Sequence, residues 1–490
     1  MRNSSALFRR SLPRDWQVAS RIQRGLVTAA LVLAVLGGAS CTSPDDGGSS
    51  SPAAVADRGL EQTVDAYLEP YLDGKNFSGV VLLAREGEIL LNKAYGMASY
   101  EDSVPNTPTT KFQIASISKS FTAAAVLLLQ ERSLLEIENP IRRFLPDFPN
   151  GETITIHQLL DHTSGLPRFV SLPGFREKSR QPHTAQDLVM WIRDEPLTSE
   201  PGKSYAFSNA NYAVLAYIIE LVSGMSYEEF LETEILEPLG LRNTGHRGDA
   251  AAVIDGMASG HVTVGRSALK PSGEFDYSTG TGSGSLYSTP EDLLEWYMAL
   301  RGERLLGSDS LKVIFEDHID SPAYGWVRGT VLDREVIRAE GWDGFGFVTQ
   351  VVHFPEERVV IAVFCNLNIR DIATDLVKNL SAIVLGEEYE TLQLIAEPID
   401  DPATLSELTG VYRHGKDFYA PEATMRIFDT EGYLFVEGNP PGRPAALLQL
   451  SENAFIHRRH WFRVRFRWND DGHVAGVRYG PFDAVKVDAN

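Results

Sequence analysis

The sequence predicts an α/β body followed by a small β domain near the C-terminus. Two pairs of strand-like runs, at 79–84 with 88–95 and at 346–354 with 358–366, lie near the two ends of the body. The stretch between them is mainly helical in pattern, which indicates one sheet that joins distant parts of the chain and is flanked by helices. Beyond residue 390 the helical pattern gives way to short strand-like runs with turn residues.

Each element of the body carries a local signal. The first pair of runs surrounds a turn at 85–87 and the second a turn at 355–357, so both predict hairpins. The run 123–130 is apolar all round, as in a helix buried inside a protein. Ser226 opens a capping box with a glutamate three residues later, and Thr289 precedes a proline and two acids. Both patterns mark helix starts.

The C-terminal β domain is expected to cover 403–490, after a linker at 400–402. Its clearest strand is 461–468, where apolar and charged residues alternate before a turn at 469–472. The alternation predicts a half-buried strand with Phe462, Val464, Phe466 and Trp468 on one face and arginines on the other. The pattern fits either a β-sandwich or a barrel.

The N-terminal segment 1–40 has the pattern of a signal peptide. Arginines precede an apolar run at 25–36 that is short for a permanent membrane helix, and small residues follow it. Cys41 comes directly after these residues and resembles the lipidated cysteine of bacterial lipoproteins. Ordinary cleavage and an uncleaved anchor are the alternatives. Residues 41–57 form a polar tether, so we expect an exported protein of the cell envelope, anchored to the membrane by lipid.

Composition argues against nucleic-acid binding and against a disulfide-stabilised body. The chain has 490 residues, with 45 lysines and arginines against 66 aspartates and glutamates, for a formal charge of -21. Such an acidic surface argues against binding to nucleic acid. Only two cysteines occur, Cys41 and Cys365, so the body has no disulfide framework. Cys365 lies in an apolar strand pattern and is expected to be a buried thiol.

Ser116 and Lys119 are the strongest catalytic candidates. They lie three residues apart just before the apolar run at 123–130, so they share one helical face. A desolvated lysine can take the proton of a serine hydroxyl and so make it nucleophilic. A helix N-terminus also offers N–H groups to a developing oxyanion. A bare Ser-x-x-Lys match is weak alone, because a helix cap followed by a solvated lysine has the same spacing.

Further stretches support the catalytic interpretation. Residues 156–167 end a helix in a glycine turn, and 201–212 lead into another apolar helix. Together with 76–79, 284–290, 324–326 and 346–347 these stretches resemble the serine β-lactamase-related superfamily over roughly residues 75–385. That superfamily includes class C β-lactamases, penicillin-binding proteins, D-aminopeptidases and family VIII esterases. The resemblance implies a β-lactamase/transpeptidase-like sandwich, in which an antiparallel sheet is flanked by helices and carries a helical subdomain, over 58–390.

The resemblance also implies a role for each matching residue. Ser116 would be the acylated nucleophile and Lys119 its base, while Asn209 would bind substrate amide groups. The second oxyanion N–H would fall at about Asp343. His162 and Thr163 match a further motif and are interpreted as structural support for the wall of the active site.

Two positions depart from the family pattern. Phe207 stands where the family usually has a tyrosine whose hydroxyl shares a proton with the lysine, and neither Tyr205 nor Tyr212 clearly replaces it. The family's Lys/His-x-Gly box aligns with 340–342 or, with a one-residue gap, with 339–341. Neither alignment restores a cation. Glu340 is therefore expected to disfavour anionic substrates such as β-lactams and to suit uncharged or cationic ones.

We expect an exported serine hydrolase that acts on a small-molecule or peptide ester or amide through an acyl-enzyme, and that is weak on β-lactams. The alternative is a catalytically impaired member of the family that acts as a binding or sensor protein in the envelope. No cofactor is implied, and the sequence has neither a zinc-binding helix motif nor a cysteine cluster to predict a metal site.

Overall fold

The computed structural model describes residues 59–248, 252–315, 323–438 and 442–487. The expectations for the signal peptide, the tether and Cys41 lie outside the described residues. Within the described residues, no helix is both long enough and apolar enough to cross a bilayer.

The body is built on a six-stranded antiparallel sheet that joins both ends of the domain. The strand order is β10-β11-β12-β13-β1-β2. Gly79 at the start of β1 lies opposite Cys365 at the end of β13, so the two predicted hairpins meet side by side. The strands are β1 (Gly79–Arg85), β2 (Glu88–Tyr95), β10 (Val327–Val331), β11 (Arg334–Trp342), β12 (Val348–Phe354) and β13 (Val359–Cys365).

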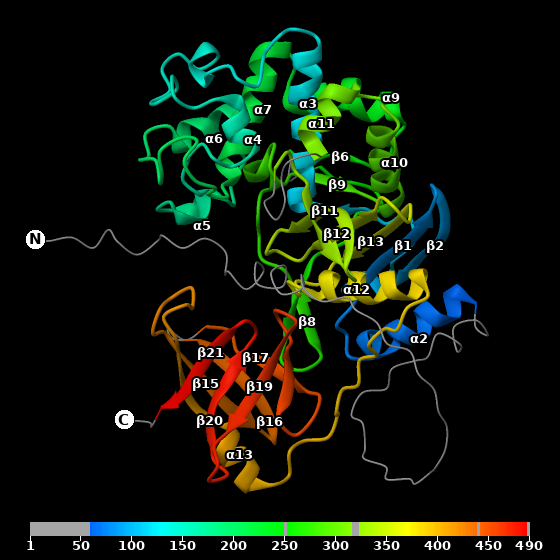
Figure 1. Ribbon diagram of the computed structural model, residues 1–490, viewed down its shortest axis with the longest axis vertical. Helices are drawn as coiled ribbons and strands as arrows, with labels where there is room; N and C mark the ends of the chain where they lie inside the picture. The colour runs from blue at the N-terminus through cyan, green and yellow to red at the C-terminus, as the bar shows by residue number, and fades with distance from the viewer. Residues whose placement is uncertain (1–58, 249–251, 316–322, 439–441, 488–490) are drawn as a thin grey trace, which may run out of the picture.

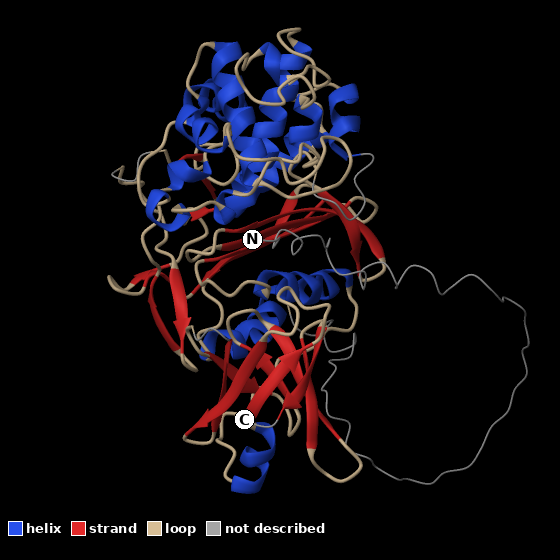
Figure 2. Ribbon diagram, turned by 90° about the vertical axis from the view of Figure 1, so that its left-hand side faces the viewer, coloured by secondary structure: helices blue, strands red, loops and turns tan. Residues whose placement is uncertain are grey.

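Helices cover both faces of this sheet (Figures 1 and 2). On one face lie α2 (Leu60–Asp73) and α12 (Ile372–Leu385), and on the other lie α3 (Ser118–Glu131) and α10 (Pro290–Arg301). Strands β12 and β13 are buried along their whole length, as expected of a layer between helices. The predicted sandwich is confirmed, and Cys365 at the end of β13 is a buried thiol, as expected.

A helical subdomain lies next to α3, at the top of the molecule in Figure 1. The predicted N-caps open two helices of this half. Ser226 accepts a hydrogen bond from Glu229 N, and Thr289 accepts one from Asp292 N. The helices are α4 (Ile156–Leu160), α5 (Phe175–Lys178), α6 (Ala185–Ile192), α7 (Asn209–Ser223), α8 (Tyr227–Leu231), α9 (Glu237–Leu239) and α11 (Ser308–Phe315). Short strands form three further small sheets, β3-β4, β5-β9-β6 and β7-β8. They are β3 (Met97–Ser99), β4 (Val104–Pro105), β5 (Phe112–Gln113), β6 (Gly245–His246), β7 (His261–Val264), β8 (Ala268–Pro271) and β9 (Leu286–Ser288).

The C-terminal domain is a closed antiparallel barrel, which decides between the two predicted architectures. A helix, α13 (Pro402–Leu408), precedes its strands. The interior is filled by apolar side chains such as Tyr412, Val464 and Phe466. The strands are β14 (Gly410–His414), β15 (Thr424–Thr430), β16 (Tyr433–Gly438), β17 (Ala445–Gln449), β18 (Ala454–His457), β19 (Phe462–Trp468), β20 (Val474–Tyr479) and β21 (Phe482–Val487).

The alternation predicted for β19 holds for most of the strand but fails at its end. Val464 and Phe466 are buried, whereas the three arginines that alternate with the apolar residues, Arg463, Arg465 and Arg467, are exposed. Trp468 was expected on the buried face, yet 42% of its surface is exposed. The register with β20 shifts between Arg467 and Trp468, and a bulge of this kind turns the following side chain out of the alternating pattern.

The barrel is joined to the body by a shared core and by one buried arginine. Leu448, Ile456 and Trp461 of the barrel pack in the same apolar cluster as α2 and α12. Trp461 also donates a hydrogen bond to Asp375 of α12. Arg458, only 1% exposed, donates hydrogen bonds to Asn76 Oδ1 and to the backbone carbonyls of Lys75, Val264, Gly265 and Ala268.

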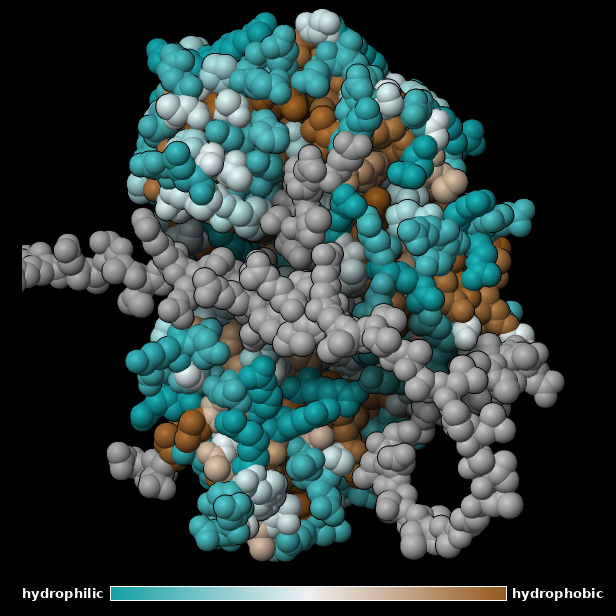
Figure 3. Space-filling view, viewed as in Figure 1, coloured by the Kyte–Doolittle hydropathy of each residue, from teal (hydrophilic) through white to brown (hydrophobic). Residues whose placement is uncertain are grey.

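Hydrophilic residues cover much of the described surface in Figure 3, on the helical subdomain and on the barrel alike. This agrees with the large negative charge of the chain.

Candidate active site

Ser116 lies in a short 3-10 helix, Ala115–Ile117, that leads directly into α3. The side chain is partly exposed, whereas its neighbours Ala115 and Ile117 are buried. Ala115 has φ +45°, a left-handed conformation that is strained for a residue with a Cβ atom. Strain of this kind costs roughly 1–3 kcal/mol and gathers at functional sites. The serine is therefore held at a bend that the surrounding fold imposes.

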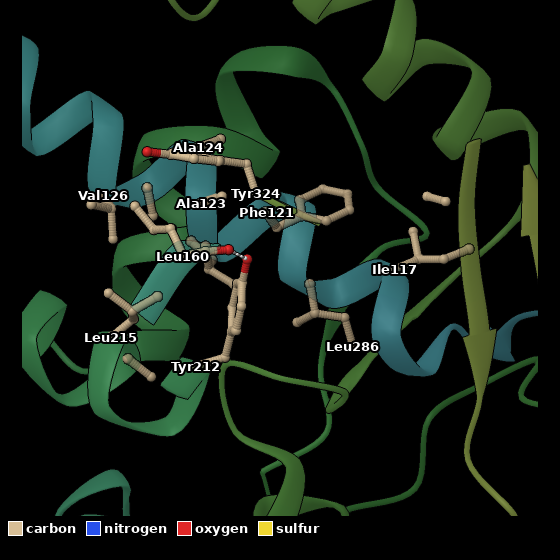
Figure 4. Close-up of a cluster of buried hydrophobic side chains, with 14 of the residues drawn as sticks. Ile117, Phe121, Ala123, Ala124, Val126, Leu160, Tyr212, Leu215, Leu286 and Tyr324 are labelled. Carbon is tan, nitrogen blue, oxygen red and sulfur yellow. Dashed lines mark hydrogen bonds between the residues drawn. The ribbon is translucent and has the colours of Figure 1, made fainter. Parts of the chain in front are cut away.

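The fold places Lys119 against Ser116. The two side chains meet because they lie three residues apart at the start of α3. The helix itself is buried, as Figure 4 shows for the residues around Phe121 and Ala124. Lys119 Nζ lies 2.9 Å from Ser116 Oγ and 2.7 Å from the carbonyl oxygen of Ser283, and donates a hydrogen bond to each. The predicted serine–lysine pair is thus within hydrogen-bond reach.

Burial makes this lysine a base near neutral pH. Lys119 is 2% exposed, and no carboxylate forms an ion pair with it among the described residues. Desolvation disfavours the ammonium form and lowers the pKa of Lys119 to about 7. A substantial fraction of Lys119 is therefore neutral at pH 7 and able to accept the Ser116 proton.

Aromatic rings surround Lys119 where the family would have a hydroxyl. Lys119 Nζ lies 5.1 Å from the centre of the Phe207 ring and 5.6 Å from that of Tyr212. The Tyr212 hydroxyl donates to the carbonyl oxygen of Leu160, 2.9 Å away, as the dashed line in Figure 4 shows. Tyr205 stands edge-on to His162. Tyr212 is therefore engaged elsewhere and does not replace the missing hydroxyl.

His162 supports the segment that carries Phe207 and Asn209. It is fully buried, and its Nδ1 accepts hydrogen bonds from Ser208 N and, in the assigned orientation, from Asn211 Nδ2. Burial and the nearby Lys119 charge lower the pKa of His162 to about 3, so the ring is neutral. Thr163 donates to Asp161 and closes the adjoining turn. These contacts give both motif residues a supporting position behind the pocket.

A small pocket of about 100 Å³ opens over Ser116. Asn209, the first residue of α7, lines it, and its buried Oδ1 has no hydrogen-bond partner within the described part of the chain. Such an acceptor is suited to a substrate amide. The pocket is lined by Ala115, Ser116, Arg168, Phe169, Val170, Phe175, Asn209, Phe275, Tyr277, Thr279, Gly280, Ser283, Gly284, Trp342 and Asp343.

The structure moves Glu340 out of the site and corrects the expectation that it sets the pocket's charge. Gly341 faces the nucleophile, because a Cβ there would lie 2.1 Å from the carbonyl oxygen of Ile114. Side chains alternate along a strand, so the buried Ala339 shares this face and Glu340 points the other way. The Glu340 carboxylate accepts hydrogen bonds from Arg338 and Gln350. The third box therefore corresponds to 339–341, with an alanine at the cation position.

Asp343 also has a different role from the expected one. Its N–H is directed at Phe347 O, 3.4 Å away, and its carboxylate accepts hydrogen bonds from the Tyr277 hydroxyl and from Phe345 N and Phe347 N. Hydrogen bonds alternate between the two edges of a paired strand, so the Trp342 N–H points away from β12. Strand β10 extends only to the partner of Arg338, which leaves that edge of β11 open toward Ser116.

Sequence reasoning did not identify Tyr277, Phe275 or Arg168 as residues of the pocket. Tyr277 and Phe275 reach it from the segment before a glycine-rich run at 280–284, and Arg168 follows the glycine turn at 165. Three glycines alternating with two small residues predict a tight loop, and that run was the available signal. Nothing local indicated which side chains the loop would bring to Ser116.

Comparisons with known proteins agree with this geometry. The model of the Beta-lactamase family matches residues 64–379. Penicillin-binding protein 4* of Bacillus subtilis (strain 168) is 28% identical over 428 residues, which cover 82% of this chain and 93% of the relative.

Two solved structures show the same fold. The octameric penicillin-binding protein homologue from Pyrococcus abyssi superposes with a TM-score of 0.60 at 21% identity and covers 87% of this chain and 100% of its own. The D-amino acid amidase from Ochrobactrum anthropi SV3, complexed with D-phenylalanine, superposes with a TM-score of 0.59 at 23% identity and covers 67% of this chain and 99% of its own. By the family match and by its fold, the chain belongs to the Beta-lactamase family of the serine β-lactamase and penicillin-binding protein superfamily.

Proposed function

We propose that the protein is a serine hydrolase that cleaves an ester or amide through an acyl-enzyme on Ser116. The observation that carries this proposal is the hydrogen bond between Ser116 Oγ and a buried lysine whose pKa is lowered to about 7. Family membership supports the same chemistry. A lysine in water would be protonated at pH 7 and could not serve as a base.

In the proposed mechanism, Lys119 accepts and donates the proton in both acylation and deacylation of Ser116. Neutral Lys119 Nζ accepts the Ser116 proton as Oγ attacks the substrate carbonyl carbon, and the oxyanion forms beside the N–H groups of Ser116 and Trp342. Collapse of the tetrahedral intermediate breaks the bond to the leaving group, which takes the proton from Lys119. Water then attacks the acyl carbonyl and gives its proton to Lys119, which returns it to Ser116 Oγ as the acid departs.

Two features favour the rival function, a binding protein that retains the fold. Phe207 contributes no hydroxyl beside Lys119, and Ala339 contributes no cation. A fluorophosphonate probe decides between the two functions. Labelling of the wild-type protein that is lost in Ser116→Ala supports the hydrolase. Ser118→Ala is the control, because Ser118 Oγ accepts a hydrogen bond from Leu286 N and does not line the pocket. Absence of labelling in folded wild-type protein supports the binder.

Weak activity on β-lactams follows from the third box in this proposal. In the family the cation of this box holds the substrate carboxylate, and here Ala339 occupies its place. Ala339→Lys is expected to raise penicillin acylation by about tenfold, because a charge-assisted hydrogen bond contributes roughly 1.5–3 kcal/mol. Glu340→Lys changes the charge more but on the opposite face of the strand, and should leave penicillin acylation unchanged. Equal responses of the two variants would place both side chains at the site and contradict the assignment.

We also propose that the protein is exported and tethered by a lipid on Cys41. The support is the sequence pattern of arginines, an apolar run and small residues before this cysteine. Cys41→Ser should release the protein into the soluble fraction or block its processing. Membrane association that persists in Cys41→Ser with an intact N-terminus would favour an uncleaved anchor.

A further inference from the structure

Arg168 places a positive charge at the catalytic pocket. It lines the pocket and is exposed, and its guanidinium carbon lies 5.9 Å from the centre of the Phe207 ring. The same ring lies 5.1 Å from Lys119 Nζ, so Phe207 is close to both Lys119 and Arg168. No ion pair involves Arg168 within the part of the chain that the structure describes. The contact with Phe207 holds the guanidinium near the site without neutralising it.

The acidic groups near the pocket do not offset this charge. Asp343 is the acidic residue in the lining, and its carboxylate is occupied by the Tyr277 hydroxyl and two backbone N–H groups. Glu340 does not line the pocket, and its carboxylate pairs with Arg338. An anion that enters the pocket therefore meets the donors of Arg168 and encounters no carboxylate that lacks its own donors.

The remaining walls are aromatic. Phe169, Phe175 and Phe275 all line the pocket. Phe275 stacks on Phe345 with ring centres 4.2 Å apart, which fixes its position. Rings of this kind bind apolar or aromatic groups through contact area and favourable ring geometry.

We propose that Arg168 binds a carboxylate of the substrate, so that the preferred ester or amide is anionic and also carries an apolar or aromatic group. This inference rests on the proposed function and names its substrate class. A guanidinium suits a carboxylate because two parallel N–H donors match its two oxygens. Arg168 enters the pocket beside Phe207, whereas the cation of the family's third box would lie on β11. A substrate carboxylate bound by Arg168 therefore occupies a different position from the carboxylate of a β-lactam bound by that cation.

The test uses two matched pairs of esters that differ only in one charge. In the first pair, 3-carboxyphenyl and 3-carbamoylphenyl phenylacetate, the charge is on the leaving group. In the second, phenyl 4-carboxyphenylacetate and phenyl 4-carbamoylphenylacetate, it is on the acyl group. The wild-type enzyme should favour the carboxylate in at least one pair, as measured by kcat/KM.

Arg168→Gln should lower kcat/KM for that carboxylate by roughly 5- to 30-fold, between the effects of exposed ion pairs and of charge-assisted hydrogen bonds. It should change kcat/KM for the matched carboxamide by less than about twofold. Arg168→Lys should retain part of the preference. Arg413→Gln, an identical change at an exposed position on the barrel strand β14, is the charge-matched control and should leave both substrates unaffected.

The salt dependence of the substrate preference gives a second test, because a purely structural role of Arg168 would not make that preference depend on salt. Raising NaCl should narrow the wild-type preference, since mobile ions screen exposed charges, and should have little effect on Arg168→Gln. The inference is overturned if the wild type shows no preference in either pair, or if Arg168→Gln slows carboxylate and carboxamide equally. A failure of the proposed function has a separate signature, because none of the four esters would then show hydrolysis that depends on Ser116.

Discussion

Two basic side chains, Lys119 in the candidate active site and Arg458 between the two domains, are both buried but differ in their hydrogen bonds and in how far burial lowers their pKa. Lys119 has two acceptors, Ser116 Oγ and Ser283 O, and burial lowers its pKa to about 7. Arg458 has five acceptors in the body, and burial lowers its pKa only to about 10.

The chemistry of the two groups explains the difference. A lysine ammonium is compact and strongly hydrated, so removal from water pushes it toward the neutral amine. A guanidinium is delocalised and carries five donors, each of which can meet a carbonyl. At neutral pH the first cation is therefore a proton acceptor, whereas the second remains charged and fixes one domain on the other.

The largest expected effect comes from removing the amine of the active site. Lys119→Met keeps most of the length of the side chain but removes the base, and should lower Ser116 acylation by roughly 10²–10⁴-fold. Thermal unfolding should show little net change in stability, because replacing a desolvated amine with an apolar group offsets the loss of the donor to Ser283 O. Acylation kinetics followed by intact mass, together with a melting curve, measure both. Unchanged acylation in a folded variant would mean that another group is the base.

Arg458→Met should have the opposite pattern. It leaves buried carbonyls without donors and should lower the free energy of unfolding by roughly 2–4 kcal/mol. Because Arg458 lies at the domain joint and does not line the pocket, labelling of Ser116 should persist in protein that remains folded. Denaturant titration gives the first quantity and probe labelling the second. Loss of labelling without loss of stability would show that the joint acts on the active site.

The next largest effect is expected in the pH dependence of acylation, which should follow the protonation of Lys119. The neutral form of Lys119 reacts, so acylation should rise about tenfold per unit below pH 7 and level off above it. The lowered pKa also makes the unfolded state bind more protons between about pH 7 and the ordinary lysine value, so the contribution of Lys119 to the free energy of unfolding rises across that interval. Stopped-flow acylation from pH 5.5 to 8.5 tests this profile. A flat profile would mean that Lys119 does not change protonation there.

The smallest effect is expected from Arg458→Lys, which tests whether stability depends on the number of hydrogen-bond donors at this position. An ammonium has three donors and cannot satisfy all the acceptors that Arg458 meets. The free energy of unfolding should fall by roughly 1–2 kcal/mol, less than in Arg458→Met. Chemical denaturation of the two variants side by side measures this order. Equal losses would show that the apolar cluster around Trp461, rather than the hydrogen bonds, holds the barrel in place.

Patterns that are local in the chain were predicted correctly. The hairpins around 85–87 and 355–357, the N-caps Ser226 and Thr289, and the buried helix after Ser116 all follow from spacing within a few residues. The serine–lysine pair is of the same kind, since two side chains three residues apart at a helix start must lie close together. The motifs also sufficed to identify the family, because each is a short segment whose order along the chain is preserved.

What the sequence by itself determined is therefore the family, the main sheet and helices, and the close serine–lysine pair that we propose as nucleophile and base. The tertiary structure alone decided the charge and shape of the pocket. One step of register on β11 turns Glu340 away and leaves Ala339 facing inward, because strand side chains alternate. Arg168 and Tyr277 reach the site from segments more than a hundred residues apart, and Arg458 meets carbonyls that lie 190 to 383 residues away in the chain. Contacts between such distant segments depend on how whole elements pack, and no local pattern encodes them.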